Sequence, residues 1–593
     1  MTTDTVLHRL HANGRNRPNA PAYYTKIGAA WVPTPWHEFL NQVRQAARAL
    51  ITLGLEPGGA ACILGFNRPE WVIFDLAAML AGGVPAGIYT TNSPQECKYI
   101  IEHSQSSVVL VENEHQWQKI KAVRDDIATL KHIVLMQGTN IDDSMTLSWE
   151  NFMAEGNKTS EEKVDARLNS LQLDQLATLI YTSGTTGPPK GVMLSHGNLA
   201  WTAQSAVPLF DLRPTDSVLS YLPLSHIAEQ MFTIHASVTV GFQVYYAQYP
   251  PQDHLNSNFR EVQPTLVFGV PRIWERFASG VQDKLALSTG IKAKIANWAQ
   301  DVGKRGAQVR HQGKELSGLL GFQHNLAEKL VFSTVKEGLG LTQARICITA
   351  AAPIAPEIVD FFNTFNIPLC ELYGQSEDCG PTTTNLPNAN KIGSVGRIWP
   401  GVEVKLGEDG EILVKGPNVF QGYYKDPAAT ESDLVNDWLH SGDLGEFDAD
   451  GYLKIVGRKK EIIITSGGKN IAPKNIEAAL KNIDLVSQAV VIGEQRRFLT
   501  ALITLNPEAA QRFAEAHNLE GKTIHQHPML IAHMQKEIDE KVNTHFARVE
   551  QVRGFKVLPR DFTVEDGELT PTLKIKRRII NENFADEIES LYE

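Results

Sequence analysis

The chain has 593 residues, too many for one hydrophobic core, so we expect two or more domains. Its hydrophobic content of 42% and charged content of 21% are ordinary for a globular protein, and its net charge of −11 argues against a nucleic-acid-binding protein, whose surface would be basic. Its five scattered cysteines form no C-x-x-C pair, which predicts reduced thiols in a cytosolic protein and no zinc site.

No export or membrane-spanning segment is expected. Residues 1–21 contain an aspartate and three arginines without an apolar block, so they do not resemble a secretory signal. The longest apolar region, residues 71–89, is interrupted by Asp75, Gly82, Gly83 and Pro85, which makes it a poor membrane span. We therefore expect a soluble cytoplasmic protein, at most peripheral at a membrane.

Strands and helices alternate in the first part of the chain. The expected elements are a strand at 60–64, a helix at 69–80, a strand at 84–89, a helix at 93–102 capped by Ser93, and a strand at 108–111. This β-α-β-α-β order predicts a parallel sheet with helices on both faces, and open sheets of this kind bind ligands at the ends of their strands.

The densest run of small polar residues in the chain directly follows an apolar strand at 176–181. Glycines allow close approach to a ligand, hydroxyl and backbone N–H groups suit phosphate oxygens, and a lysine can hold the polyphosphate charge. The run is not a Walker A loop, because Pro188 follows Gly187, and a flexible surface loop is the alternative. The predicted phosphate-binding residues are Thr182, Ser183, Gly184, Thr185, Thr186, Gly187 and Lys190.

The same run resembles the signature of the acyl-adenylate-forming enzymes, the superfamily of acyl-CoA synthetases, luciferases and peptide-synthetase adenylation domains. The resemblance continues in the family's order at residues 221–229, 350–353, 373–377, 441–445, 457–477 and 570–577. It implies an α/β fold with a large N-terminal domain of parallel and mixed sheets with helices, residues 1–458, and a small mobile C-terminal α+β domain, residues 459–593. It also implies ATP, Mg²⁺ and coenzyme A as cofactors and co-substrate.

Two segments are expected to bind the acyl group. His226 begins a helix and, although a lone histidine is more often structural, the family places a histidine beside the acyl group. The site lacks the aspartate with which amino-acid-activating relatives bind an ammonium, which favours a plain carboxylic acid. Trp274 lies in a segment that resembles the start of the acyl tunnel in long-chain fatty acyl-CoA synthetases, and it is either a gate of that tunnel or a core tryptophan.

A long, mostly helical insertion is expected at residues 280–340, as in the long-chain members of the family. It carries the basic residues Lys292, Lys294, Lys304, Arg305 and Arg310. These could contact an anionic membrane surface, but a solvated helix face is the more frequent role of such residues.

The nucleoside and the metal ion are assigned to two further motifs. A strand ending at residue 349 runs into alanines where the family usually has glycines, and these remain small enough for adenine to lie against the backbone. Tyr373 can stack on adenine, and Glu377, with Thr182, can bind the Mg²⁺ that accompanies ATP. The remaining residues expected around the nucleotide are Ala351, Ala352, Gly374 and Ser376.

A glycine turn presents Asp443, whose carboxylate can accept both ribose hydroxyls, although an Asp-Gly surface turn is the alternative. Arg458, Lys459 and Lys460 then lie between two apolar runs, and they form either a hairpin turn or a domain hinge. The resemblance favours a hinge that pivots at Lys460, with Arg458 near the nucleotide.

The C-terminal part is expected to carry two functional segments. A glycine loop, Gly467, Gly468 and Lys469, enters the active site of relatives during the second half-reaction. Lys574 occupies the position of the family's catalytic lysine, preceded by leucine where many relatives have glycine, and Lys576 is the rival position.

The combined reading is an ATP-dependent, AMP-forming ligase that converts a medium- or long-chain fatty acid to acyl-AMP and then to acyl-CoA. The alternative is a fatty acyl-AMP ligase that loads an acyl carrier protein. A luciferase-like oxygenase and a catalytically inactive nucleotide-binding regulator are less favoured, because the tunnel segment is of the fatty acyl type and every catalytic group is present. The expected partners are fatty acid, ATP and CoA, with a homodimer left open.

Overall fold

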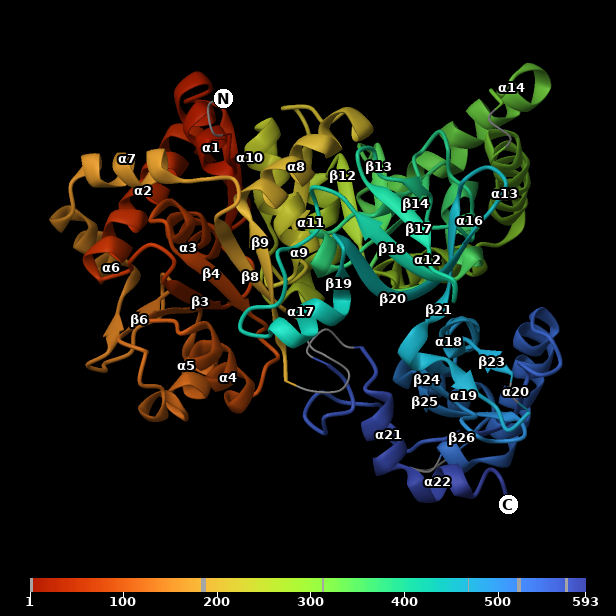
Figure 1. The fold of residues 1–593 in the computed structure, drawn as a ribbon. Helices are drawn as coiled ribbons and strands as arrows, with labels where there is room; N and C mark the ends of the chain where they lie inside the picture. Colours follow the sequence, from red (N-terminus) through yellow and green to blue (C-terminus); the bar gives the residue numbers. More distant parts are fainter. Residues whose placement is uncertain (1–3, 183–187, 312–313, 468, 520–523, 571–573) are drawn as a thin grey trace.

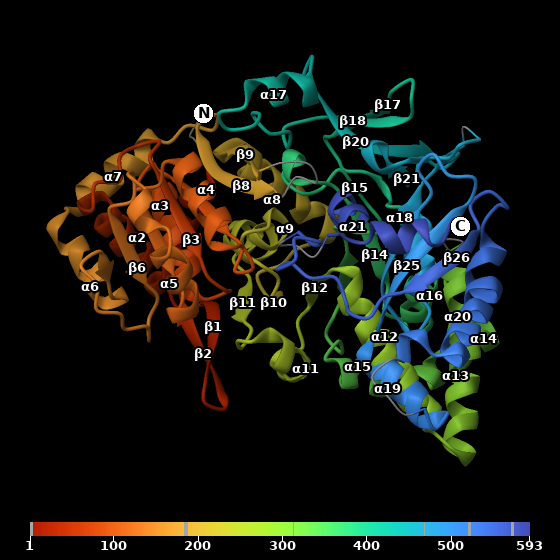
Figure 2. The same ribbon diagram turned by 90° about the horizontal axis from the view of Figure 1, so that it is seen from below.

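The computed structural model describes residues 4–182, 188–311, 314–467, 469–519, 524–570 and 574–593. It has a large N-terminal domain of sheets and helices and a small C-terminal domain (Figure 1). Turning the molecule by 90° shows helices on both sides of the sheets in the large domain (Figure 2). The predicted α/β fold class with a smaller α+β domain is therefore confirmed.

The first sheet of the large domain contains the predicted β-α-β-α-β unit. Within the described residues the strand order is β7 (Thr146–Leu147), β6 (His132–Leu135), β5 (Val108–Val111), β3 (Ala60–Leu64), β4 (Val84–Ile88), β8 (Leu176–Thr182) and β9 (Lys190–Ser195). All neighbours are parallel except β8 and β9, which form an antiparallel pair. The helix expected after Ser93 is α4 (Pro94–Ser104), and the Ser93 side chain accepts a hydrogen bond from the Glu96 backbone N–H.

The apolar region at residues 71–89 forms a buried helix and strand rather than a surface segment. Helix α3 (Pro69–Leu80) has proline at its first turn, and every residue after Pro69 is buried, as expected for a helix that is apolar on all sides. It packs against α2 (Trp36–Thr52). Among the helices of the described residues, none has both the length and the hydropathy of a membrane span.

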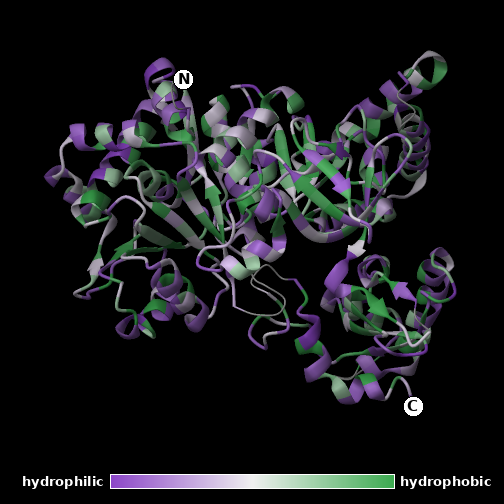
Figure 3. Cartoon of the chain, in the orientation of Figure 1, coloured by the Kyte–Doolittle hydropathy of each residue, from purple (hydrophilic) through white to green (hydrophobic). Residues whose placement is uncertain are grey.

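The large domain has three further sheets among the described residues. The first has the strand order β10 (Ser217–Ser220), β11 (Gln243–Tyr246), β1 (Pro21–Ile27), β2 (Ala30–Pro35). The second has the order β12 (Leu266–Gly269), β13 (Ile346–Thr349), β14 (Leu369–Tyr373), β15 (Thr383–Thr384), β16 (Arg397–Ile398), and the third has the order β17 (Glu403–Leu406), β18 (Glu411–Lys415), β20 (Trp438–Phe447), β19 (Leu434–Val435), with β21 (Leu453–Arg458) paired to β20. Strands β12, β13 and β14 are parallel, so their carboxyl ends meet at one edge. Hydrophobic residues predominate in the central strands (Figure 3).

The insertion after β12 is helical, as predicted. Its elements are α12 (Pro271–Ala286), α13 (Gly290–His311), α14 (Gly318–Ala327), η4 (Glu328–Phe332) and α15 (Ser333–Leu339). Helix α13 packs on α14 and on α16 (Pro356–Thr364), which follows β13. The insertion is thereby attached to the sheet whose strand ends face the site.

The C-terminal domain has its own sheet and core. Its three-stranded sheet contains β24 (Val486–Ile492), β25 (Leu499–Leu505) and β26 (Val552–Val557), and β22 (Ile463–Ile464) pairs separately with β23 (Asn470–Ile471). The helices are α18 (Pro473–Leu480), α19 (Pro507–Ala516), α20 (Pro528–Glu537), α21 (Arg577–Asn583) and α22 (Ala585–Glu589). Helix α20 continues as a π-helix, Ile538–Val542, and a 3₁₀ turn, Asn543–His545.

Candidate active site

A cleft of about 3480 Å³ lies between the N-terminal and C-terminal domains. Its floor is formed by the carboxyl ends of β12, β13 and β14, and its far wall belongs to the C-terminal domain. The sequence-predicted residues that line it are Thr182, Lys190, His226, Ala351, Ala352, Tyr373, Gly374, Ser376, Glu377, Asp443, Arg458, Lys460 and Lys574.

An aromatic, an acidic and a basic residue form a small network at one end of this cleft. Tyr373 ends β14, and its hydroxyl donates a hydrogen bond of 3.0 Å to Asp443 Oδ2. Arg458 Nε lies 3.4 Å from Asp443 Oδ1. Asp443 does not lie on a free turn as predicted: it is inside strand β20, where a bulge follows the left-handed Gly442.

The backbone beside this network is unusually close-packed. Ala351, after the end of β13, has a φ of 72°, a conformation that L-residues rarely adopt. Gly374, after the end of β14, has no room for a side chain, because a Cβ there would lie 1.6 Å from the carbonyl oxygen of Gly380. The small residues at both strand ends can therefore let a flat ligand lie close to the backbone.

The two ends of the predicted phosphate loop face each other across the β8–β9 pair. Thr182 and Lys190 are partners in the antiparallel register, and both line the cleft. The ammonium of Lys190 lies 4.3 Å from the ring centroid of Tyr423 and 3.9 Å from Asp433 Oδ2. The predicted residues Ser183, Gly184, Thr185, Thr186 and Gly187 lie outside the described residues.

Glu377 is connected to this group through the Tyr423 hydroxyl. The Tyr423 hydroxyl lies 2.9 Å from Glu377 Oε1 and 3.1 Å from Asp433 Oδ2, and shares its single proton between them. Burial raises the pKa of the Glu377 carboxyl, and the Tyr423 hydroxyl offsets part of that rise. No cluster of three or more metal-ligating side chains occurs in the described parts of the chain.

That donor set fits Mg²⁺ that arrives with a nucleotide. Mg²⁺ usually keeps several waters and is held by one or two carboxylates together with substrate phosphates. Glu377 supplies one such carboxylate, Thr182 supplies a hydroxyl at the same cleft, and a cation here would favour the ionised carboxylate.

His226 is the N-cap of the short helix α9 (Ile227–Gln230), and its Nδ1 accepts a hydrogen bond of 3.2 Å from the Ala228 backbone N–H. Burial and, to a smaller extent, the charge of Lys574 lower the pKa of His226 to about 4. At neutral pH the ring is therefore uncharged. With Nδ1 accepting, Nε2 carries the proton.

Glu229 fixes the position of this helix. Its buried carboxylate accepts hydrogen bonds from Ser220 Oγ and Thr233 Oγ1, each at 2.8 Å, and from Asn67 Nδ2 at 3.3 Å. Burial raises the pKa of Glu229 to about 7, while these donors act against the rise. The helix start that carries His226 is thereby tied to β10 and to the loop after β3.

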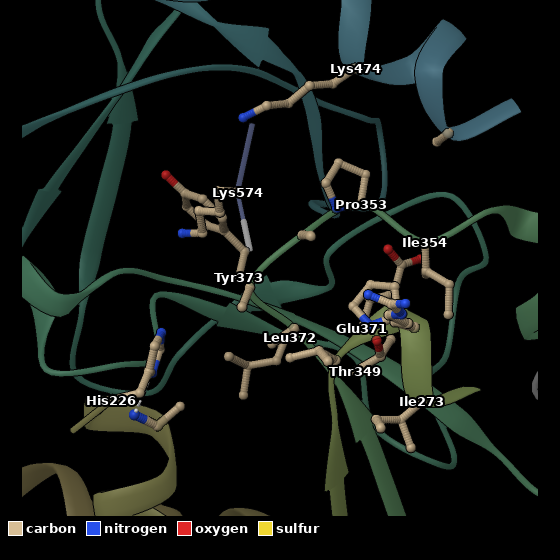
Figure 4. A pocket seen from close by; sticks show the side chains of 18 of the residues that line it. His226, Ile273, Thr349, Pro353, Ile354, Glu371, Leu372, Tyr373, Lys474 and Lys574 are labelled. Carbon is tan, nitrogen blue, oxygen red and sulfur yellow. Dashed lines mark hydrogen bonds between the residues drawn. The ribbon is translucent and has the colours of Figure 1, made fainter. Parts of the chain in front are cut away.

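Lys574 reaches the cleft from the C-terminal domain. Figure 4 shows Lys574 and Lys474 near Tyr373, with His226 lining the same pocket. The side chain is accessible from the cleft, but the walls displace water around the ammonium; this desolvation and then the like charges of Arg458 and Lys474 lower the pKa of Lys574. Lys576, the rival position, is instead the N-cap of α21.

Three predicted residues lie away from the cleft lining. Trp274 is fully buried, and its Nε1 lies 3.3 Å from the carbonyl oxygens of Gly269 and Ile348, while its neighbour Ile273 lines the cleft. Gly467 and Lys469 are exposed in the loop between β22 (Ile463–Ile464) and β23 (Asn470–Ile471). Gly468 lies outside the described residues.

The segment predicted from the sequence as a hinge contains one turn of 3₁₀-helix. Element η6 (Lys459–Glu461) follows β21, and the Ile462 backbone N–H donates to the Arg458 carbonyl oxygen. Ion pairs join Lys459 to Asp409 at 2.6 Å and Lys474 to Glu461 at 3.0 Å. Lys460 is exposed at the middle of the turn.

Sequence reasoning missed three residues of this site: Tyr423, Asp433 and Lys474. Tyr423 and Asp433 lie between recognisable motifs, in the region around α17 (Pro427–Asp433). An isolated β-bridge between Val192 and Tyr423 brings this segment beside Lys190. The spacing of residues in the sequence does not reveal such a long-range pairing. Lys474 begins a helix after a proline, where a lysine is ordinary.

Comparisons with known proteins give the family of the chain. In curated proteins, the long-chain-fatty-acid–CoA ligase ACSBG2 of Xenopus laevis is 37% identical, with 99% of this chain and 84% of that protein aligned. The protein of the same name from Homo sapiens is 35% identical, with 96% and 90% aligned.

Solved structures agree in fold. The anthranilate CoA ligase AuaEII in complex with anthranoyl-AMP has a TM-score of 0.72 at 20% identity, covering 98% of each chain. The o-succinylbenzoate CoA synthetase of Bacillus subtilis in complex with its acyl-adenylate intermediate has a TM-score of 0.69 at 22% identity, again covering 98% of each chain. An AMP-binding enzyme model matches residues 10–424, and an AMP-binding enzyme C-terminal domain model matches residues 460–593. The chain belongs to the family of AMP-binding enzymes.

Proposed function

We propose that this protein is an ATP-dependent, AMP-forming fatty acid–CoA ligase for medium- or long-chain acids. The observation that carries the proposal is the convergence of Lys190, Glu377, Asp443, Arg458 and Lys574 on one cleft that also contains a neutral histidine. The names of the curated relatives, which are long-chain-fatty-acid–CoA ligases, support the acyl specificity and the CoA acceptor.

In the first step, a carboxylate oxygen of the fatty acid attacks the α-phosphorus of ATP, and the bond to the β-phosphate breaks to release pyrophosphate. Positioning and charge neutralisation supply most of the catalysis in such a transfer. Tyr373 and Asp443 would hold adenine and ribose, with Gly374, Ser376 and the turn at Ala351 and Ala352 beside the base. Lys574 would offset the charge that develops at the α-phosphate.

The phosphate end would be held by Thr182, Lys190 and the loop between them. Mg²⁺ would be bound by Glu377, with Thr182, and would supply charge neutralisation of the phosphates when bound. His226, whose Nε2 carries the proton, would lie beside the acyl carboxylate as a neutral donor.

In the second step, the CoA sulfur attacks the acyl carbonyl carbon, the bond to the AMP oxygen breaks, and the thiol proton leaves. We place the domain boundary between residues 458 and 459 and the pivot at Lys460. Rotation there would withdraw Lys574 and bring the loop of Gly467, Gly468 and Lys469 to the cleft. The exposure of Gly467 and Lys469 away from the present lining is consistent with this exchange.

Trp274 is proposed to close the inner end of the acyl path. It is buried beside the cleft-lining Ile273, with its Nε1 against carbonyl oxygens of β12 and β13, so its rotation would lengthen the cavity. We further place the protein in the cytoplasm, with peripheral membrane contact. A homodimer is the oligomeric state to be tested by measuring the mass of the protein in solution.

The test is product identification. Purified protein receives Mg·ATP, CoA and saturated fatty acids from butyrate to docosanoate, and nucleotides and acyl-CoA are quantified by chromatography. We expect equal amounts of AMP and acyl-CoA, with the highest rates for medium or long chains. ADP as the nucleotide product would contradict the proposal. Acyl-AMP that turns over with an acyl carrier protein but not with CoA would select the carrier-loading alternative.

A further inference from the structure

The helical insertion exposes an unusual number of large apolar side chains. Seven of the large hydrophobic residues exposed in the described part of the chain lie within this one segment. They are Leu287, Ile291, Ile295, Leu319, Phe322, Leu326 and Leu330. Scattered single residues of this kind are normal at a protein surface, but a concentration of them marks an interaction surface.

Four of them form a stripe along α14 and η4. Leu319 is 73% exposed, Phe322 68%, Leu326 40% and Leu330 51%. Their spacing of three, four and four residues puts them on one face of the helix. The opposite face carries the buried residues His324 and Ala327, where α14 packs on α13.

Helices α14 and η4 are therefore apolar on the face that points away from α13. A surface helix normally places polar residues there. Figure 1 shows α14 at the end of the molecule opposite to α7, so its outward face is reached without crossing another element of the large domain.

The charge of the insertion differs from that of the whole chain. Residues 281–340 contain nine Lys and Arg and five Asp and Glu, a net charge of +4, whereas the whole chain has −11 and the remainder therefore −15. Lys292, Lys294, Lys304 and Lys329 are exposed, and no ion pair among the described residues engages their ammonium groups. Lys329 directly precedes Leu330 on the stripe.

We propose that the outward face of α14 and η4, flanked by these lysines, docks the protein onto a bilayer that contains anionic phospholipids. The apolar side chains would enter the boundary between head groups and acyl chains, and the lysines would pair with the lipid charge. A second copy that docked through the same face would present the same positive charge and be repelled by it. Charge complementarity therefore selects the anionic bilayer as the occupant.

The surface is placed where it would serve the proposed activity, and in this respect the inference rests on that function. The cleft extends along α12 as far as Asp283, and α12 leads directly into α13. Each methylene favours the hydrocarbon phase by about 0.8 kcal/mol, so long-chain acids are concentrated in membranes. Docking through α14 would hold the acyl end of the cleft beside the fatty acids in the membrane.

Vesicle sedimentation of the full chain tests the docking surface. We compare vesicles of phosphatidylcholine with vesicles that also contain phosphatidylserine, for the wild type, Leu319→Gln with Phe322→Gln, and Ile27→Gln. Ile27 is 64% exposed on the remote β1–β2 turn and is the matched control. We expect binding to the anionic vesicles, lost about tenfold or more in the double variant and unchanged in the control.

A charge-reversal variant adds an independent measurement. Lys292→Glu with Lys329→Glu should also weaken binding to the anionic vesicles, and added salt should weaken binding of the wild type. Equal binding of the double variant and the wild type, or no vesicle binding at all, would overturn the proposal. A dimer of the wild type that the double variant loses would assign the face to a second copy instead.

The test distinguishes failure of the docking proposal from failure of the proposed function. AMP formation from octanoate in free solution should be equal for the wild type and the double variant, because no residue of the stripe lines the cleft. Absence of AMP with intact vesicle binding would contradict the proposed function and leave the docking surface in place.

Discussion

At Ala351 the turn after β13 holds an alanine in a conformation that suits glycine. Its φ of 72° lies in the left-handed region, which costs an L-residue roughly 1–2 kcal/mol. The residue lines the cleft beside Gly374, so the strain lies where backbone would face the nucleotide. Backbone strain of this kind persists where the surrounding structure determines the conformation.

Replacing Ala351 with glycine should relieve that strain. The gain is reduced by the greater freedom of glycine in the unfolded chain, about 0.5–1 kcal/mol, so we expect a neutral to slightly stabilising change. Ala350, which does not have a positive φ, is the matched control, and Ala350→Gly should destabilise the protein. Urea unfolding measures both. Equal destabilisation by the two variants would show that the turn is not strained at Ala351.

The low pKa of His226 predicts how the protein responds to acid. The folded-state value of about 4 lies below the ordinary value of 6.5, so between these values the unfolded chain binds the proton more readily. The contribution of His226 to stability is therefore complete above the ordinary value and is lost as the pH falls toward about 4. In NMR spectra, with His226→Asn for assignment, the ring should remain neutral at pH values well below 6.5. Titration with a midpoint at the ordinary value would contradict the burial assigned to it.

At the scale of elements, the turn η6 is the connection on which the two-step proposal depends. Lys460 lies in its middle, and the backbone there is already in a helical turn. Proline fixes φ near −65° and removes an N–H donor, so Lys460→Pro should hold the present orientation, with Lys574 at the cleft. Few backbone dihedrals need to change in a hinge, so blocking one position is enough to test it.

The two half-reactions should therefore respond oppositely to two variants. Lys460→Pro should form acyl-AMP at nearly the normal rate and lose most thioester formation from supplied acyl-AMP, whereas Lys460→Ala should retain both. Lys574→Ala should lose about 10²–10³-fold in adenylation, the usual cost of one electrostatic stabiliser, and spare the thioester step. Lys576→Ala is its matched control. Equal slowing of both steps by Lys460→Pro and by Lys574→Ala would exclude domain rotation about η6.

The packing of α12 against β12 and β13 predicts the effect of Trp274. Trp274→Phe should remove the indole N–H between the Gly269 and Ile348 carbonyls and free space behind Ile273. We expect a shift of chain-length preference toward longer acids, with the KM for ATP unchanged. Phe365→Leu, in the same hydrophobic cluster, is the control for a general loss of stability. An unchanged chain-length profile would make Trp274 a core residue.

How far the sequence predicts these elements depends on whether a signal is local. The helix at Pro69–Leu80 and the strands at 60–64 and 108–111 are predicted to the residue, because proline, capping and apolar runs act over a few positions. The glycine beside Asp443 favours a turn, but pairing of β20 with β18 and β21 makes this segment a bulged strand. Tyr423 was missed because its bridge to Val192 joins residues far apart in the chain.

At the scale of the whole molecule, the proposed activity depends on two domains sharing one cleft. Lys574 comes from the C-terminal domain, whereas Tyr373, Glu377 and His226 come from the large domain. Charges of both signs meet there in a partly desolvated space, which strengthens their interactions with a reacting phosphate. Neither domain alone contains the complete set.

Oxygen transfer from the fatty acid to AMP tests the central claim most directly. The protein receives palmitate labelled with oxygen-18 in its carboxyl group, together with Mg·ATP and CoA, and the nucleotide products are analysed by mass spectrometry. Attack of the carboxylate on the α-phosphate followed by thioester formation must leave one labelled oxygen in the phosphate of AMP. We predict singly labelled AMP in an amount equal to palmitoyl-CoA. Unlabelled AMP, or label in inorganic phosphate with ADP as the nucleotide product, would contradict an acyl-adenylate mechanism.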